Sequence, residues 1–138
     1  MRFILISLML VAGLNGFNQK NAKPTIQIAD SLFTIREWSA AIPVYEVVLK
    51  NEPNNSLAWN RLGFSYHNLS KYDKALENYS KSLSYKPNPG LETTVQSRTA
   101  RIYAVKKDQD KSFESLNRAL QLGYANLNEL DTQEEFNN

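Results

Sequence analysis

The sequence lacks most of the residues from which a reaction centre is built. Its 138 residues include no cysteine, a single histidine (His67) and no glycine-rich phosphate-binding loop. A metal site needs several histidines, cysteines or carboxylates that converge, and no such ligand spacing occurs. One histidine beside many serines does not define a catalytic triad. We therefore predict a protein that is not an enzyme, with no catalytic residues, no metal and no cofactor.

An excess of charge of one sign is also missing. Sixteen lysines and arginines stand against fourteen aspartates and glutamates, a net charge of +2. We expect the cluster of Arg98, Arg101, Lys106 and Lys107 to form a solvated helix face, so no nucleic-acid partner is predicted. Without cysteine the fold must rely on helix packing instead of disulfides, which suits an exported bacterial protein.

The chain does contain an internal repeat of 34 residues. An order of aromatic, small, aromatic, aliphatic and proline occurs twice, at Trp38, Ala41, Tyr45, Leu49 and Pro53 and again at Tyr72, Ala75, Tyr79, Leu83 and Pro87. A fixed period between about 20 and 50 residues is typical of stacked repeats. Such stacks form extended surfaces that bind other chains. The period therefore favours an interaction surface.

The second copy carries a family resemblance. Residues 59–66 read Trp-Asn-Arg-Leu-Gly-Phe-Ser-Tyr, which resembles the W-x2-L-G-x2-Y opening of a tetratricopeptide repeat. Ala75, Tyr79 and Pro87 follow in the expected slots, and Ser82 stands where alanine is usual. The resemblance implies an all-α, right-handed α-solenoid of about three helix-turn-helix units. The expected repeat domain is 22–126, with units at 22–55, 56–89 and 93–126.

The outer units match the pattern less well. Thr25 and Leu32 replace the Trp and Tyr of the opening in the first unit, whose second helix is expected at 39–49 with Pro43 within about its first turn. The third unit comes late, and its extra residues are expected in the turn at 87–90. Gly63 and Ala75 of the middle unit are small, which predicts a close approach of its two helices.

The first 18 residues read as a secretory signal peptide. Arg2 gives a positive start, an apolar run follows at 3–12, and Gly13 and Gly16 are small residues near a cleavage point within 13–19. The run is shorter than the ~20 residues that span a bilayer, and an uncleaved anchor is the alternative. We expect an exported protein, periplasmic or secreted, that touches a membrane only through this segment if it stays uncleaved.

The last residues differ from the repeats. Apolar Leu127, Leu130 and Phe136 alternate with acidic residues, and we expect a short C-terminal capping helix within 127–138. The segment also looks like the closing part of exported bacterial repeat proteins, some of which continue into a hydrolase or another domain. The alternative function is therefore an N-terminal regulatory or docking arm of a larger secreted enzyme.

In tetratricopeptide stacks the first helices of the units line a concave groove. The resemblance places the partner site there, on Asp30, Phe33, Asn60, Phe64, His67, Asn68 and Arg101. Some relatives clamp a peptide's terminal carboxylate with Lys and Asn, but Ile26 and Asp30 stand in those slots and only Arg98 remains, so chaperone-tail recognition is not carried over.

We expect a protein or peptide partner, extended or helical, and no small-molecule substrate. The alternatives are an empty groove in a spacer or dimer surface, a Phe64 that packs against a neighbouring unit, and a His67 that simply faces solvent.

Overall fold

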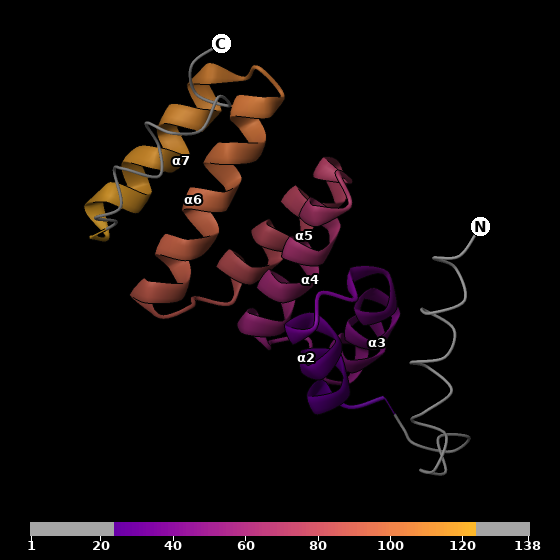
Figure 1. The fold of residues 1–138 in the computed structure, drawn as a ribbon. Coiled ribbons are helices and arrows are strands. Elements are labelled where there is room, and N and C mark those ends of the chain that lie inside the picture. Colours follow the sequence, from indigo (N-terminus) through magenta and orange to yellow (C-terminus); the bar gives the residue numbers. More distant parts are fainter. Residues whose placement is uncertain (1–23, 124–138) are drawn as a thin grey trace, which may run out of the picture.

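The computed structural model describes residues 24–123, and every regular element in that range is an α-helix. The six helices are α2 (Ile26–Thr34), α3 (Trp38–Asn51), α4 (Ser56–Asn68), α5 (Tyr72–Ser84), α6 (Pro89–Val105) and α7 (Gln109–Gln121). They form three consecutive hairpin pairs that follow one another along the molecule (Figure 1). The predicted all-α helical solenoid is confirmed. The predicted signal peptide at 1–18 and cap at 127–138 lie outside the described residues.

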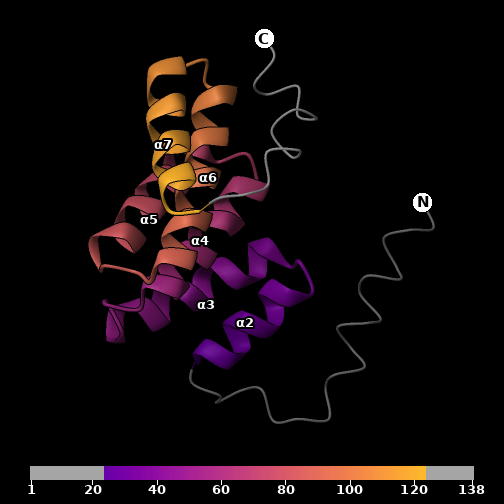
Figure 2. The same ribbon diagram turned by 90° about the vertical axis from the view of Figure 1, so that its left-hand side faces the viewer.

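The stack curves because its two layers are spaced differently. Within the described range, neighbouring first helices contact each other, α2 with α4 and α4 with α6, whereas neighbouring second helices do not. The first helices therefore lie on the inner, concave side. A quarter turn of the molecule shows α6 and α7 side by side, at an angle to the α2–α3 pair (Figure 2).

Asparagine side chains cap the N-termini of α4 and α6, the first helices of the second and third pairs. Asn55 Oδ1 accepts a hydrogen bond from the Ala58 N–H at 3.0 Å, and Asn88 Oδ1 accepts one from the Leu91 N–H at 2.9 Å. Pro89 is the first residue of α6, where a missing N–H costs no helical bond. α6 thus begins four residues before position 93, and the extra residues expected in a turn lengthen the helix instead.

Proline inside α3 lies deeper than the sequence predicted. Pro43 is the sixth residue of this helix, in its second turn, and the helix continues unbroken to Asn51. The proline removes the N–H that would bond to the carbonyl of Ser39. Both Ser39 and Pro43 are exposed, so water can satisfy that carbonyl.

The same turn closes each helix pair. Arg36, Ser70 and Lys107 all have positive φ, at 62°, 56° and 60°. In each case the next residue's N–H donates to the carbonyl five residues earlier at 2.9 Å, a Schellman-type closure: Glu37 to Leu32, Lys71 to Tyr66 and Asp108 to Tyr103. The three units therefore share one backbone connection although their residues differ.

The centre of the core is the crossing of α4 and α5. A Cβ built on Gly63 would lie 2.7 Å from two ring carbons of Tyr79 and 3.2 Å from the carbonyl oxygen of Ala75. Ala75 and Tyr79 are both fully buried. The crossing has no space for a side chain at position 63, as the sequence predicted. Buried apolar residues extend this core into the outer pairs, among them Ala29, Ala41, Tyr45, Val95, Ala100, Ile102 and Ala119.

No helix in residues 24–123 combines the length and the apolar character needed to cross a membrane.

Candidate functional site

Five aromatic side chains form a continuous strip across the first two helix pairs. We call it the aromatic strip; its members are Phe33, Trp38, Phe64, His67 and Tyr72. Consecutive ring centroids lie 5.2 to 6.2 Å apart, mostly in edge-to-face geometry. Aromatic pairs prefer this arrangement. All five side chains are only partly buried, so the strip leaves an apolar surface exposed outside the core.

Arg98 of α6 covers one side of the strip. Its guanidinium carbon lies 4.0 Å from the ring centroid of Phe64, and Nη1 donates to Asn60 Oδ1 at 2.9 Å. Asn60 is only 4% exposed, so it holds the arginine in place instead of facing a ligand. Among the described residues Arg98 has no carboxylate partner. Burial is the main cause that lowers the pKa of Arg98.

His67 lies within the strip, between Phe64 and Tyr72. Its Nδ1 is 3.5 Å from the buried Tyr79 hydroxyl, a distance at the long limit for a hydrogen bond. Burial and then the charges of Arg101 and Arg98 lower the pKa of His67 to about 4. The imidazole is therefore neutral near pH 7. The alternative of a histidine that simply faces solvent describes it incompletely, because the imidazole is partly buried between the rings of Phe64 and Tyr72.

Asp30 sits at the other end of the site, where it already has partners in the chain. It accepts a hydrogen bond from the Tyr45 hydroxyl at 2.7 Å and forms an ion pair with Arg61. Arg61 also lies over the Phe33 ring, 5.6 Å from its centroid. Burial, followed by the hydrogen bond to Asp30, raises the pKa of Tyr45 above its usual value. Asp30 therefore serves as an internal bridge beside the strip.

The remaining predicted residues flank the strip. Asn68 is exposed and donates to the Phe64 carbonyl of its own helix at 2.8 Å. Arg101 is half-buried on α6, close enough for its charge to act on His67. The structure thus gathers Phe33, Phe64 and His67 in one surface, with Asn60 beneath it.

Three contributors lie outside the site predicted from the sequence. Trp38 and Tyr72 occupy the same slot of successive repeats, which was read as packing only. Arg98 was placed on a solvated face with its neighbours; Lys106 and Lys107 are indeed exposed, but Arg98 is enclosed by Phe64 and Asn60. The 34-residue spacing of Trp38 and Tyr72 could have indicated their role. Each is the first residue of the second helix of its unit, where the side chain lies beside the first helix of the same unit.

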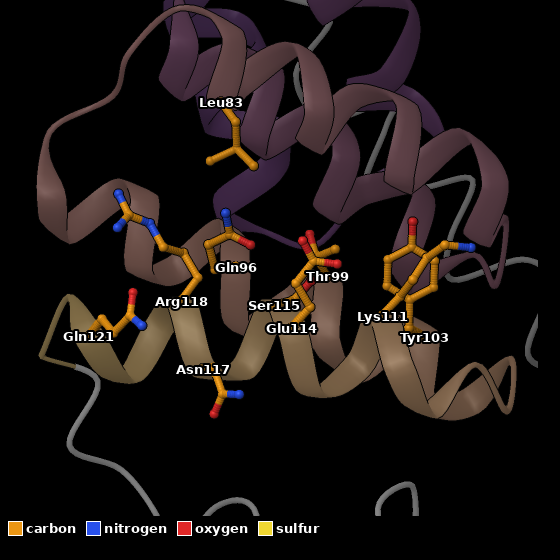
Figure 3. A pocket seen from close by; sticks show the side chains of 10 residues that line it. All are labelled: Leu83, Gln96, Thr99, Tyr103, Lys111, Glu114, Ser115, Asn117, Arg118 and Gln121. Carbon is orange, nitrogen blue, oxygen red and sulfur yellow. The ribbon is translucent and has the colours of Figure 1, made fainter.

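Two clefts lie between second helices of neighbouring pairs. The cleft between α5 and α7, of about 590 Å³, brings Leu83 opposite side chains of α6 and α7 (Figure 3). A second cleft, of about 390 Å³, lies between α3 and α5. They are repeat-related, because a lysine lies 5.3 Å from a tyrosine ring centroid in each: Lys111 over Tyr103, and Lys74 over Tyr66.

The larger cleft has little charge left for a ligand. Lys111 pairs with Asp108, and Arg118 pairs with Glu92. Within residues 24–123, no three acidic, histidine or cysteine side chains are grouped to hold a metal ion. The aromatic strip and its arginine are therefore the better candidate for a binding surface.

Comparisons with known proteins agree with this architecture. The family profile described as tetratricopeptide repeat matches residues 56–89. The peroxisomal targeting signal receptor of Saccharomyces cerevisiae is 33% identical over 73 residues, which are 51% of this chain and 12% of the receptor. The receptor of Candida glabrata is 34% identical over 67 residues, 47% of this chain and 11% of the receptor. The chain therefore spans only about an eighth of these relatives.

Solved structures with a similar fold come from the MamA proteins. The structure described as MamA MSR-1 C2 superposes with a TM-score of 0.65 at 23% identity, over 73% of this chain and 59% of that one. A crystal structure of MamA gives a TM-score of 0.62 at 26% identity, over 68% of this chain and 53% of that one. The matching repeat at 56–89 and the three stacked helix pairs give this chain a tetratricopeptide-repeat fold, which supports a module for protein–protein interaction.

Proposed function

We propose that this chain is a non-catalytic interaction module of an exported bacterial protein, which binds a peptide or a partner protein on its concave face. The observation that carries the proposal is the aromatic strip. It keeps five rings partly exposed on and beside the first helices. The related receptors are named for a targeting signal that they receive, which supports a protein or peptide ligand here.

The strip suits an apolar side chain of a partner. Aromatic rings offer a large contact area and lose little side-chain entropy on binding, which is why they are enriched in the energetic centres of interfaces. The strip crosses from α2 to α5, so a ligand laid along it would touch two repeat units. An extended or helical peptide with one or two apolar anchors fits such a surface.

The surroundings of His67 support a non-catalytic role. A general base needs a pKa near the working pH and an orienting partner. The pKa of His67 is about 4, and two arginines face it where a carboxylate would be needed. Nothing in this environment would activate the imidazole as a base near pH 7.

Export is the part of the proposal that depends on residues 1–18. Their positive start and short apolar run support a cleaved signal peptide. Mass spectrometry of the protein recovered from the envelope or the medium tests this point. A mature N-terminus within about residues 13–20 is expected, whereas recovery of Met1 would show an uncleaved anchor.

The binding face is tested by site-specific photocrosslinking in the native host fraction. A photoreactive amino acid at His67 should capture a defined protein, and one at Phe113 should not. Phe113 is a matched control because it is 61% exposed on α7, away from the strip. A Phe64→Ala variant that still unfolds cooperatively should lose the capture, and Phe113→Ala should keep it. Equal capture from both positions would refute the concave face as the binding site.

A further inference from the structure

The two clefts between second helices share one arrangement of residues, so they can be compared position by position. Tyr103 and Lys111 of the larger cleft follow Tyr66 and Lys74 of the smaller one by the same 37 residues. In both clefts the lysine lies 5.3 Å from the centroid of its tyrosine ring. A shift of 37 residues therefore relates α4 and α5 to α6 and α7.

An indole ring lines the smaller cleft. Trp59 of α4 contributes the ring, and the amine of Lys81 of α5 lies 4.7 Å from its centroid. The indole N–H donates to the Pro53 carbonyl at 2.7 Å. Leu49 of α3 and Leu62 of α4 line the same cleft. The ring is therefore covered by a cation and has aliphatic neighbours.

The larger cleft keeps the surroundings of such a ring but has no indole. Gln96 stands at the position of Trp59, and Arg118 stands at the position of Lys81. Leu83, which repeats the leucine of α3, faces them from α5 (Figure 3). The cleft measures about 590 Å³, about one and a half times the 390 Å³ of the smaller one. It therefore has room for a planar ring between α5 and α7.

Arg118 is held where it can cover a ring in this cleft. Its Nε and Nη2 both contact Glu92 Oε1, at 2.9 Å and 2.7 Å. These contacts use the edge of the guanidinium, so its flat face is left to stack on an aromatic ring. Arginine is the cation most often found over aromatic rings. Arg118 can therefore do for a bound ring what Lys81 does for Trp59.

The edge of the cleft suits a segment of another protein. Exposed polar side chains line its opening, namely Lys111, Glu114, Asn117, Arg118 and Gln121. An aromatic anchor enclosed by a polar rim is typical of the centre of a protein interface, and tryptophan is among the commonest anchors. The two tryptophans of this chain already belong to the aromatic strip and the smaller cleft. The ring would therefore come from a different protein.

We propose that the cleft between α5 and α7 is a second docking site, which takes a tryptophan side chain from a segment of another protein. The ring lies against Leu83 and beneath Arg118, in the space that Gln96 leaves open. This site is on the outer layer of the stack, formed by second helices. It goes beyond the proposed function of the concave face and does not depend on it.

Binding of the peptide acetyl-Gly-Trp-Gly-amide to the full chain tests the proposal. Two-dimensional NMR of the isotope-enriched chain should show saturable shift changes, largest at the side-chain amide of Gln96 and the Nε–H of Arg118. The matched probe is acetyl-Gly-Leu-Gly-amide, which has an apolar side chain but no ring. It should bind at least about threefold more weakly, because it gains no interaction with the guanidinium face.

Matched variants identify the contacts. Gln96→Trp restores the indole of the middle unit and should abolish binding of the peptide, whereas Gln27→Trp adds an indole on the exposed side of α2 and should not. Arg118→Ala should weaken binding about threefold. Arg118→Lys should keep most of it, because a lysine covers the ring in the smaller cleft. Arg118 is exposed, so its variants test the site even if Gln96→Trp does not fold.

Several results would overturn the proposal. Shift changes confined to Phe64 and His67 would assign the peptide to the aromatic strip, and the absence of saturable changes would show no site at all. Binding of free indole without binding of the peptide would show a cleft that a protein segment cannot enter. Equal binding of the two peptides, or binding that survives Gln96→Trp, would show that the cleft does not select a ring.

The two proposals fail in distinguishable ways. The peptide reports on the outer cleft whether or not the concave face binds a protein, and crosslinking at His67 reports on the concave face alone. Phe113 remains a valid control for that crosslinking. At about 100° per residue it lies about 140° around α7 from Arg118, on the side of the helix away from the cleft.

Discussion

Replacing Gly63 by alanine is the sharpest test of the core. Two effects oppose each other. Alanine is favoured over glycine within a helix by about 1 kcal/mol. Against this, the new methyl group would lie 2.7 Å from two Tyr79 ring carbons and 3.2 Å from the Ala75 carbonyl oxygen. Overpacking of this kind costs about 1–3 kcal/mol. Tyr79 is fully buried and cannot swing into solvent, so the cost lies at the upper end. We expect a net loss of about 1–2 kcal/mol in the free energy of unfolding.

Gly90 provides the matched control. It is also helical, in the first turn of α6, but a methyl group there would meet only Asn88 Oδ1 at 3.5 Å, an ordinary contact. Gly90→Ala should therefore stabilise the protein by about 0.5 kcal/mol, since alanine restricts the unfolded chain. Urea melts of both variants, followed by circular dichroism at 222 nm, measure the two changes. A Gly63→Ala variant as stable as Gly90→Ala would refute the argument that this crossing is closed to a side chain.

Three further changes test the cap, the histidine and the surface. Asn88→Ala removes the acceptor for the Leu91 N–H and should cost about 1 kcal/mol in a denaturant melt, and no loss would mean that α6 does not begin at Pro89. The pKa of His67 is lower in the folded chain than in the unfolded one, so the free energy of unfolding should fall as the pH drops from 6.5 towards 4. Over that interval the wild type should lose about 1–3 kcal/mol more than His67→Gln. Parallel pH profiles of the two proteins would contradict the burial of the imidazole. Lys106→Ala breaks an exposed ion pair with Asp73 and should change the free energy of unfolding by less than about 0.5 kcal/mol in the same melts. A loss above about 1 kcal/mol would show a stronger contact between the second and third helix pairs.

The fold could be predicted because its determinants are local and periodic. The 34-residue spacing identified the helix pairs even in the first unit, where Thr25 and Leu32 replace the typical opening residues. The start of α6 was missed because Pro87-Asn88-Pro89-Gly90 reads as a turn. The pair Asn88-Pro89 is equally a helix-start signal, with a capping side chain followed by a proline at the first position. Turn and helix start share these residue types, so the sequence alone does not separate them.

The site was predictable only where it follows the repeat. Phe33, Phe64 and His67 occupy corresponding faces of first helices, and the structure does bring them together. The setting of Arg98 depends on the contact between α4 and α6, which is a tertiary feature with no local signal. For the same reason the partial burial of His67 was not predicted. That these residues bind a partner stays a prediction.

The left-handed turns have a consequence for how such chains diverge. Arg36, Ser70 and Lys107 share one backbone geometry, yet none is glycine or asparagine, the types that adopt it most easily. The docked helix pair imposes the geometry, and any side chain that is not branched at Cβ is accepted at modest cost. Substitutions can therefore remove the sequence similarity between duplicated segments while the left-handed turn between their helices is kept. A repeat whose sequence has diverged would be recognised more reliably by the spacing of these left-handed turns than by residue identity.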